Sequence, residues 1–292
     1  MSGINPKSKK NLGSAHQELA SAVESTNPPS RVPFTKLDFQ KAKIQGKKIS
    51  VITAYDYTSA QLLDSAGIDC LLVGDSPGMV IQGQSDALSV TMEQMIYHSR
   101  CVRQGTKNAF VVTDLPFMTY QVSPEQALIN AGQLIQSGRA QGVKLEGGIR
   151  SAAAISKITQ ADIPVMGHIG LTPQSIHQFG GFRVQRNEEK LINDALAVQD
   201  SGAFALVLEC IPAELAKTIT SRLTIPTIGI GAGPHCDGQV LVFHDLLGMF
   251  SDLKPKFVKI FAAIGEQIKQ AAQLYQQEIQ SGTYPDTEHS FR

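Results

Sequence analysis

The sequence predicts a (β/α)8 barrel, a closed α/β fold of the TIM type. Short apolar runs rich in β-branched residues recur along the chain. Each run is continuous instead of alternating, which is typical of parallel strands buried on both faces. Helix-like segments separate most runs, and eight strands with such helices over about 250 residues favour a barrel. The runs are 48–56, 70–76, 109–117, 142–148, 163–170, 204–210, 225–233 and 239–245.

Local signals mark the helices between these runs. Thr91 and Gln94 form a capping-box pattern, and Ser123 with Pro124 gives a cap followed by proline at the first helical position. The alternative architecture is an open doubly wound sheet, which would carry a glycine-rich nucleotide fingerprint after its first strand. The glycine-rich segment 229–234 instead follows the seventh run, so we interpret it as a tight loop.

The two ends of the chain differ from the middle. Residues 1–31 are rich in Ser, Asn, Lys and Pro and poor in large apolar side chains, so we expect a flexible N-terminal tail. Residues 32–292 are expected to form one catalytic barrel domain. A helix expected at 257–280 packs either on the barrel or on a neighbouring subunit.

Composition argues against several classes of function. Lys plus Arg and Asp plus Glu are both 26, and the chain has no Trp, which argues against nucleic-acid binding. No apolar run is long enough to span a bilayer, and the N-terminus lacks the apolar region of a secretory signal. The four cysteines are widely spaced, as in free thiols of a reducing compartment. We therefore expect a cytoplasmic protein that acts on small molecules.

Ionisable side chains follow one predicted strand after another. In a (β/α)8 barrel the carboxyl ends of all strands meet at one rim, where active sites form. This placement therefore predicts an active site at the rim. The ionisable residues are Asp56, Asp75, Asp114, Lys144, Glu146, His168, Glu209, His244 and Asp245.

The acids at this rim favour a metal site. Carboxylates gathered in a small space repel one another, and their pKa values rise unless a counter-charge offsets them. A divalent cation that prefers oxygen ligands, Mg²⁺ or Mn²⁺, is a suitable counter-charge. Asp75 and Asp114, on adjacent strands, are the expected direct ligands. Glu146 on the next strand completes the arc, directly or through water.

The same rim contains candidates for substrate binding and proton transfer. Lys144 lies two residues before Glu146, so both side chains leave one face of the strand, and an ammonium there suits a substrate carboxylate. Glu209 ends the sixth strand, across the barrel from Asp75 and Asp114, which suits a general base. The predicted chemistry is metal-assisted enolisation, followed by making or breaking of a carbon–carbon bond.

Each of these residues also has a structural interpretation. An aspartate after a strand commonly caps the next helix. For Asp56 this capping role and a functional role are about equally expected. For each of the other aspartates, considered alone, the capping role also remains an alternative. Lys144 has the alternative role of an ion-pair partner of Glu146. His168 is either a substrate contact or a structural imidazole.

Seven segments of the sequence together resemble the ketopantoate hydroxymethyltransferase family, also called 3-methyl-2-oxobutanoate hydroxymethyltransferase. The resemblance runs from about Phe34 to the C-terminal EHSF and leaves only the N-terminal segment uncovered. The segments are TAYDY (53–57), LLVGDSPGM (71–79), TDLPFMTY (113–120), VKLEGG (143–148), GHIGLTPQS (167–175), LVLECIP (206–212) and IGIGAGPHCDGQVLVFHDLLG (228–248).

This resemblance implies a fold, a reaction and an assembly. The implied fold is a (β/α)8 barrel of the phosphoenolpyruvate mutase and isocitrate lyase type. The implied reaction transfers a hydroxymethyl group from 5,10-methylenetetrahydrofolate to 3-methyl-2-oxobutanoate, giving 2-dehydropantoate, in the biosynthesis of pantothenate, the coenzyme A precursor. The resemblance also implies one Mg²⁺ per subunit and a homodecamer.

The resemblance assigns a role to each matched position at the rim. The proton acceptor falls on Glu209. The implied metal ligands are Asp75, Asp114 and Glu146. The implied substrate contacts are Asp75, Ser76, Asp114 and Lys144. We add His168 as a further expected substrate contact, because it lies at the end of the fifth predicted strand.

Two other functions remain as alternatives. A carbon–carbon lyase or phosphonate mutase on the related barrel uses a similar acid cluster, but such lyases typically carry a KKCGH-type loop that this sequence lacks. A barrel kept as a binding scaffold would have no use for the acids at 75, 114, 146 and 209, because an unused cluster of buried charges only destabilises the fold.

Overall fold

The computed structural model describes residues 31–250 and 255–291. The chain divides into a unit Met1–Val32 and a unit Pro33–Arg292. The tail expected at 1–31 lies almost entirely outside the described residues. Within the described part of the chain, no helix combines the length and the apolar character needed to cross a membrane.

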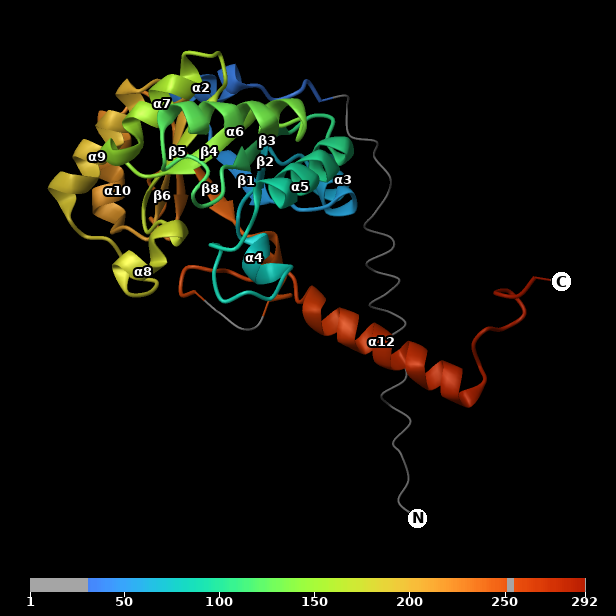
Figure 1. Ribbon diagram of the computed structural model, residues 1–292. Helices are drawn as coiled ribbons and strands as arrows, with labels where there is room; N and C mark the ends of the chain where they lie inside the picture. The colour runs from blue at the N-terminus through green and yellow to red at the C-terminus, as the bar shows by residue number, and fades with distance from the viewer. Residues whose placement is uncertain (1–30, 251–254, 292) are drawn as a thin grey trace. The chain divides into compact units, whose positions relative to one another are not determined.

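Eight parallel strands form a closed barrel, as the sequence predicts. Each strand pairs with the next along the chain, and β1 also pairs with β8, which closes the ring. The labels in Figure 1 follow the order of the chain. The strands are β1 (Ile49–Thr53), β2 (Cys70–Val73), β3 (Phe110–Asp114), β4 (Gly142–Glu146), β5 (Val165–Gly170), β6 (Ala205–Glu209), β7 (Thr227–Ile230) and β8 (Gly238–Leu241).

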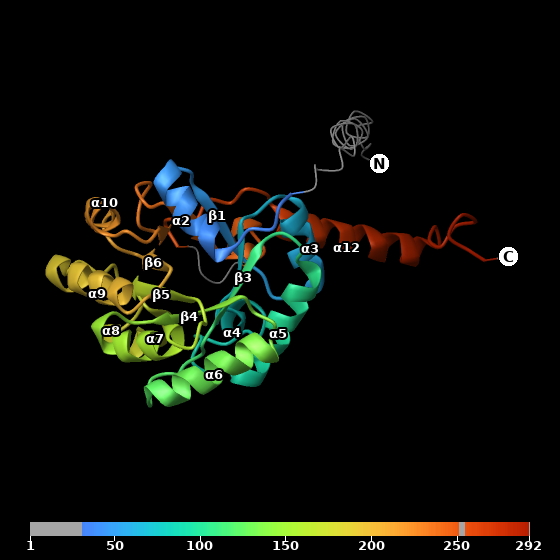
Figure 2. The ribbon, with the colours of Figure 1, turned by 90° about the horizontal axis from the view of Figure 1, so that it is seen from above.

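Helices follow most strands and surround the barrel, as Figure 2 shows from above. The longer helices are α2 (Lys36–Gln45), α3 (Tyr57–Ser65), α5 (Met92–Gly105), α6 (Pro124–Gln136), α7 (Ala152–Thr159), α9 (Glu188–Asp200), α10 (Ala213–Arg222) and α12 (Ile264–Ser281). The short ones are α4 (Pro77–Val80), α8 (Ile176–Phe179), α11 (Phe243–Leu246) and the 3-10 turns η2 (Ile149–Ser151) and η3 (Pro173–Ser175).

Two apolar cores hold the barrel together, because successive residues on each strand face opposite sides. Leu71 belongs to the core between strands and helices, and Leu72 to the core inside the barrel. Helix α2 closes the inner core at the amino ends of the strands. The ring centroid of Phe39 lies 5.7 Å from that of Phe110 and 4.9 Å from that of Phe204, edge to face.

The local signals read from the sequence are confirmed, with one exception. Thr91 and Gln94 form the capping box of α5, and the Ser123 side chain accepts a hydrogen bond at the start of α6. The helix expected from residue 257 begins only at Ile264. The backbone of the preceding segment pairs instead with the C-terminal end of α11, through Phe261 N to Leu246 O at 2.8 Å.

Gly170 fixes how the ends of β5 and β6 meet. Its φ is +100°, and a Cβ on this residue would overlap the carbonyl oxygen of Glu209. The same carbonyl accepts a hydrogen bond from Leu171 N at 2.9 Å. Only glycine therefore lets the chain leave β5 while staying bonded to the end of β6.

We predict that Gly170→Ala lowers the free energy of unfolding by more than about 2 kcal/mol, because it adds both a positive-φ penalty and a backbone clash. The matched control is Gly132→Ala inside α6, where a Cβ would meet nothing within 4 Å. There alanine should raise the free energy of unfolding by about 0.5–1 kcal/mol. Urea unfolding of both variants measures the difference, and equal effects would contradict this account of Gly170.

Candidate active site

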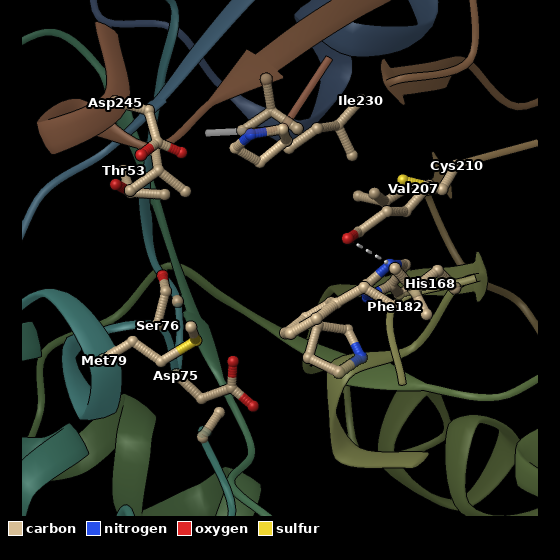
Figure 3. A pocket seen from close by; sticks show the side chains of 18 of the residues that line it. Thr53, Asp75, Ser76, Met79, His168, Phe182, Val207, Cys210, Ile230 and Asp245 are labelled. Carbon is tan, nitrogen blue, oxygen red and sulfur yellow. Dashed lines mark ion pairs between the residues drawn. The ribbon is translucent and has the colours of Figure 1, made fainter. Parts of the chain in front are cut away.

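The carboxyl ends of the strands surround a cavity of about 360 Å³. All seven predicted site residues line it, whereas Asp56 and His244 are not among its lining residues. Figure 3 shows Asp75 and Ser76 on one wall and His168 on the facing wall. The seven are Asp75, Ser76, Asp114, Lys144, Glu146, His168 and Glu209.

Two other strand-end acids have different surroundings. Asp56 caps α3, because its side chain accepts a hydrogen bond from Ser59 N at 2.9 Å. The structure thus supports the capping interpretation of this residue. Asp245 does line the cavity, and partial burial raises the pKa of its carboxyl to about 6.

Asp75, Asp114 and Lys144 form one connected group. The Asp114 carboxylate accepts a hydrogen bond from Asp75 N at 3.1 Å, and the Lys144 ammonium lies 2.8 Å from Asp114 Oδ2. Lys144 and Asp114 are register partners on neighbouring strands. The ion-pair partner of Lys144 is therefore Asp114, not the Glu146 considered from the sequence.

His168 lies between two carboxylates. Its Nδ1 is 3.4 Å from Glu146 Oε1, and its Nε2 is 3.2 Å from Glu209 Oε2. Burial and the Lys144 ammonium lower the pKa of His168, but the two carboxylates outweigh them and raise it to about 9. The imidazolium thus links the candidate base to one of the candidate metal acids.

Burial dominates the titration of the aspartates. It raises the pKa of Asp75 to about 7, with the charges of Asp114 and Glu146 acting in the same direction. Burial also raises the pKa of Asp114, against the Lys144 charge. Desolvation lowers the pKa of Lys144, but Asp114, Glu146 and Asp75 together hold it above its ordinary value. The lysine therefore stays charged.

Two buried carboxylate oxygens fit a bound cation. Asp114 Oδ1 is buried without a hydrogen-bond partner, and Glu146 Oε1 has none beyond its 3.4 Å approach to His168 Nδ1. The buried cations of the group are Lys144 and His168, and Arg183, Lys256 and Asp245 also line the cavity. Within residues 31–250 and 255–291, no three His, Cys, Asp or Glu side chains are placed to hold an ion by themselves. The arrangement suits Mg²⁺, which commonly takes one or two carboxylates and completes its shell with substrate and water.

Three uncharged residues of the site were not predicted. Tyr55 forms a hydrogen bond of 2.6 Å between its hydroxyl and Ser76 Oγ. Gln174 donates from Nε2 to Asp75 Oδ2 at 2.9 Å, and the Tyr120 hydroxyl donates to Gln174 Oε1 at 2.7 Å. All three lie in the segments that resemble the family. They were not predicted because the prediction relied on ionisable residues at the ends of strands, and these side chains are neutral.

The chain is similar to known proteins over most of its length. A family model described as ketopantoate hydroxymethyltransferase matches residues 33–287. A 3-methyl-2-oxobutanoate hydroxymethyltransferase from Clostridium novyi (strain NT) is 56% identical over 262 residues, which cover 88% of this chain and 95% of the relative. A protein of the same name from Pelobacter propionicus is 54% identical over 264 residues, covering 89% and 98%.

Solved structures show the same fold at low sequence identity. A phosphonopyruvate hydrolase, in complex with oxalate and Mg²⁺, aligns with a TM-score of 0.60 and 13% identity, over 88% of this chain and 93% of the other. A 2,3-dimethylmalate lyase of the PEP mutase/isocitrate lyase superfamily gives 0.56 and 18%, over 87% and 91%. The expected barrel type is thereby confirmed.

We predict that Asp75→Asn makes the metal-free protein more stable at high pH. Because the pKa of Asp75 is raised, the folded protein holds this proton more tightly than the unfolded chain does. That stabilisation is present below about pH 4 and is lost as the pH rises through about 7. The stability of the variant relative to the parent should therefore grow by roughly 2 kcal/mol between pH 5 and pH 8.

Urea unfolding in EDTA at the two pH values measures this difference. Asp200→Asn, at an exposed aspartate ending α9, is the matched control and should show no such growth. A parent–variant difference independent of pH would refute the raised pKa of Asp75.

Proposed function

Because the chain belongs to the ketopantoate hydroxymethyltransferase family, we propose that it transfers a hydroxymethyl group from 5,10-methylenetetrahydrofolate to 3-methyl-2-oxobutanoate. The product is 2-dehydropantoate, in pantothenate biosynthesis. The observation that carries the proposal is that Glu209 lines the same cavity as the acid group of Asp75, Asp114 and Glu146. One cavity thus offers a base opposite a cluster that suits a divalent cation.

The 2-oxo acid is bound by the polar side chains of the cavity. Lys144, charged at neutral pH, attracts the substrate carboxylate. Ser76, whose hydroxyl is fixed by Tyr55, supplies a further hydrogen bond. Asp75 and Asp114 would hold the cation, with Glu146 near it. His168 faces Asp75 across the cavity and would contact the substrate from there.

Glu209 is the proposed general base and removes the proton from carbon 3. The His168 imidazolium, 3.2 Å from Glu209 Oε2, keeps this carboxylate directed into the cavity. A divalent cation such as Mg²⁺, when bound, supplies Lewis-acid polarisation of the keto oxygen. Carbon 3 then forms a bond to the methylene carbon of the folate, and water supplies the new hydroxyl. Both carbon–nitrogen bonds of the methylene break, and tetrahydrofolate leaves with the proton taken from carbon 3 and one proton of the water. The product has no proton left on carbon 3, so a second addition is blocked.

We predict that the enzyme with Mg²⁺ exchanges the carbon 3 proton of 3-methyl-2-oxobutanoate in D₂O, and that a hydroxymethyl signal arises only with the folate. Glu209→Gln should slow the exchange by at least about 100-fold, because it removes the base but keeps the shape of the side chain. Proton NMR follows both signals in one sample.

The matched control is Glu214→Gln, which changes an exposed glutamate on α10 and should leave exchange at the parent rate. Exchange without any folate-dependent product would argue for another use of the enolate. No exchange in the parent with Mg²⁺ or Mn²⁺ would refute the proposal, and lyase substrates would be the next to test.

We also propose that the chain assembles with copies of itself, for which the family resemblance implies a homodecamer. Helix α12 supports assembly, because in the single chain none of its residues is buried. It nevertheless exposes Ile268, Tyr275 and Ile279 at helical spacing. An amphipathic face of this kind is stabilised when a neighbour covers it.

We predict that Ile268→Asp with Tyr275→Asp lowers the assembly state, because the two substitutions place charges in the apolar face. Size-exclusion chromatography with light scattering gives the mass of the particle. The control pair Gln270→Asp and Gln277→Asp changes the opposite face of α12 and should leave the mass as it is. Equal masses for both double variants would exclude α12 from the interface.

A further inference from the structure

Gln174 is a buried, uncharged residue that contacts two of the three candidate metal acids. It lies in η3, just beyond β5, and is 6% exposed. Its backbone N donates to Glu146 Oε2 at 3.1 Å, and its side-chain Nε2 donates to Asp75 Oδ2 at 2.9 Å. One residue therefore sets the position of a carboxylate on β4 and of another after β2.

The orientation of the Gln174 amide is fixed by its other partners. The Tyr120 hydroxyl accepts a hydrogen bond from Glu146 N at 3.2 Å, so its own proton is free to go to Gln174 Oε1 at 2.7 Å. Gln121 also donates to Oε1, at 3.1 Å, and the Leu115 carbonyl accepts from Nε2 at 3.0 Å. A flipped amide would lose all three contacts, so Nε2 necessarily faces Asp75.

The uncharged hydrogen-bond donors of Gln174 orient the carboxylates without neutralising their charge. The Gln174 backbone N–H donates to Glu146 Oε2, so Oε1 has no contact beyond its 3.4 Å approach to His168 Nδ1. An ammonium or guanidinium in place of the amide would orient the carboxylates equally well, but it would also neutralise them. The side-chain amide orients Asp75 and the backbone N–H orients Glu146, and neither removes the negative charge of its partner.

We propose that Gln174, held by Tyr120, is a positioning residue that presents Asp75 and Glu146 to a divalent cation. This inference rests on the cation site of the proposed function. Partners of this kind behind the ligands of a metal site commonly change metal affinity by 10- to 100-fold. The loss on substitution should therefore include cation binding by the folded protein, in addition to the cost in stability of the lost buried hydrogen bonds.

The test measures binding of Mn²⁺ to the full-length protein by titration with EPR detection of the free ion. Gln174→Leu should weaken binding by about 10- to 100-fold. Tyr120→Phe, which keeps the ring but removes the hydroxyl, should weaken it several-fold. At saturating Mn²⁺ both variants should recover a kcat near that of the parent. Gln133→Leu, at an exposed position on α6, is the matched control and should bind as the parent does.

Thermal melts in EDTA separate positioning from folding. The metal-free Tyr120→Phe variant should melt somewhat below the parent, because the buried hydroxyl is lost, but still in one transition well above the temperature of the Mn²⁺ titration. A variant that is unfolded at that temperature would overturn the positioning role of Tyr120 in favour of a purely structural one. Parent-like Mn²⁺ binding in both variants would overturn the role of Gln174 while leaving the cation site intact. A parent that binds no Mn²⁺ would overturn the cation site itself, and this inference with it.

Discussion

The repulsion among buried carboxylates is the constraint on which the rest of this structure depends. Closure of eight parallel strands brings the acids of β2, β3, β4 and β6 to one rim, where Asp75, Asp114 and Glu146 are each less than 5% exposed. Lys144 and His168 are the buried cations that offset them, and Arg183 and Lys256 also line the cavity. Burying the three acids is costly for the metal-free fold and useful for binding a cation, so the same residues lower stability and serve function.

The barrel tolerates this cost because the site is built on its most rigid parts. Each acid lies on a strand or directly after one, and the inner and outer cores fix the strands from both sides. Gly170 joins the ends of β5 and β6, so Glu209 and the turn that carries Gln174 are placed by one backbone contact. The side chains that hold the acids are themselves hydrogen-bonded, which leaves few alternative arrangements.

The barrel, its eight strands and the charged residues at the strand ends of the cavity could be predicted from the sequence, whereas Arg183 and Lys256, which also line the cavity, were not. Parallel strands buried on both faces read as continuous apolar runs, and a charge at the end of such a run stands out. Gln174 could not be found in this way, because its contact with Asp75 joins positions 99 residues apart and its amide carries no charge. The partner of Lys144 was missed for a related reason. Asp114 lies beside it through strand register and forms the ion pair, whereas Glu146, two residues along the same strand, acts on Lys144 without forming one.

The packing of α2 over the amino end of the barrel has a kinetic consequence. With Phe39 packed against Phe110 and Phe204, the amino end of the barrel is closed, so reactants enter and leave by the rim alone. The acids lie deep in the cavity, whereas Phe182 at its lining is 48% exposed. Under the proposed function, a small acid bound among these carboxylates arrives before the larger one-carbon donor, and its product leaves after the spent carrier. On that proposal, a cavity closed at one end favours an ordered sequential mechanism, in which the smaller substrate binds first.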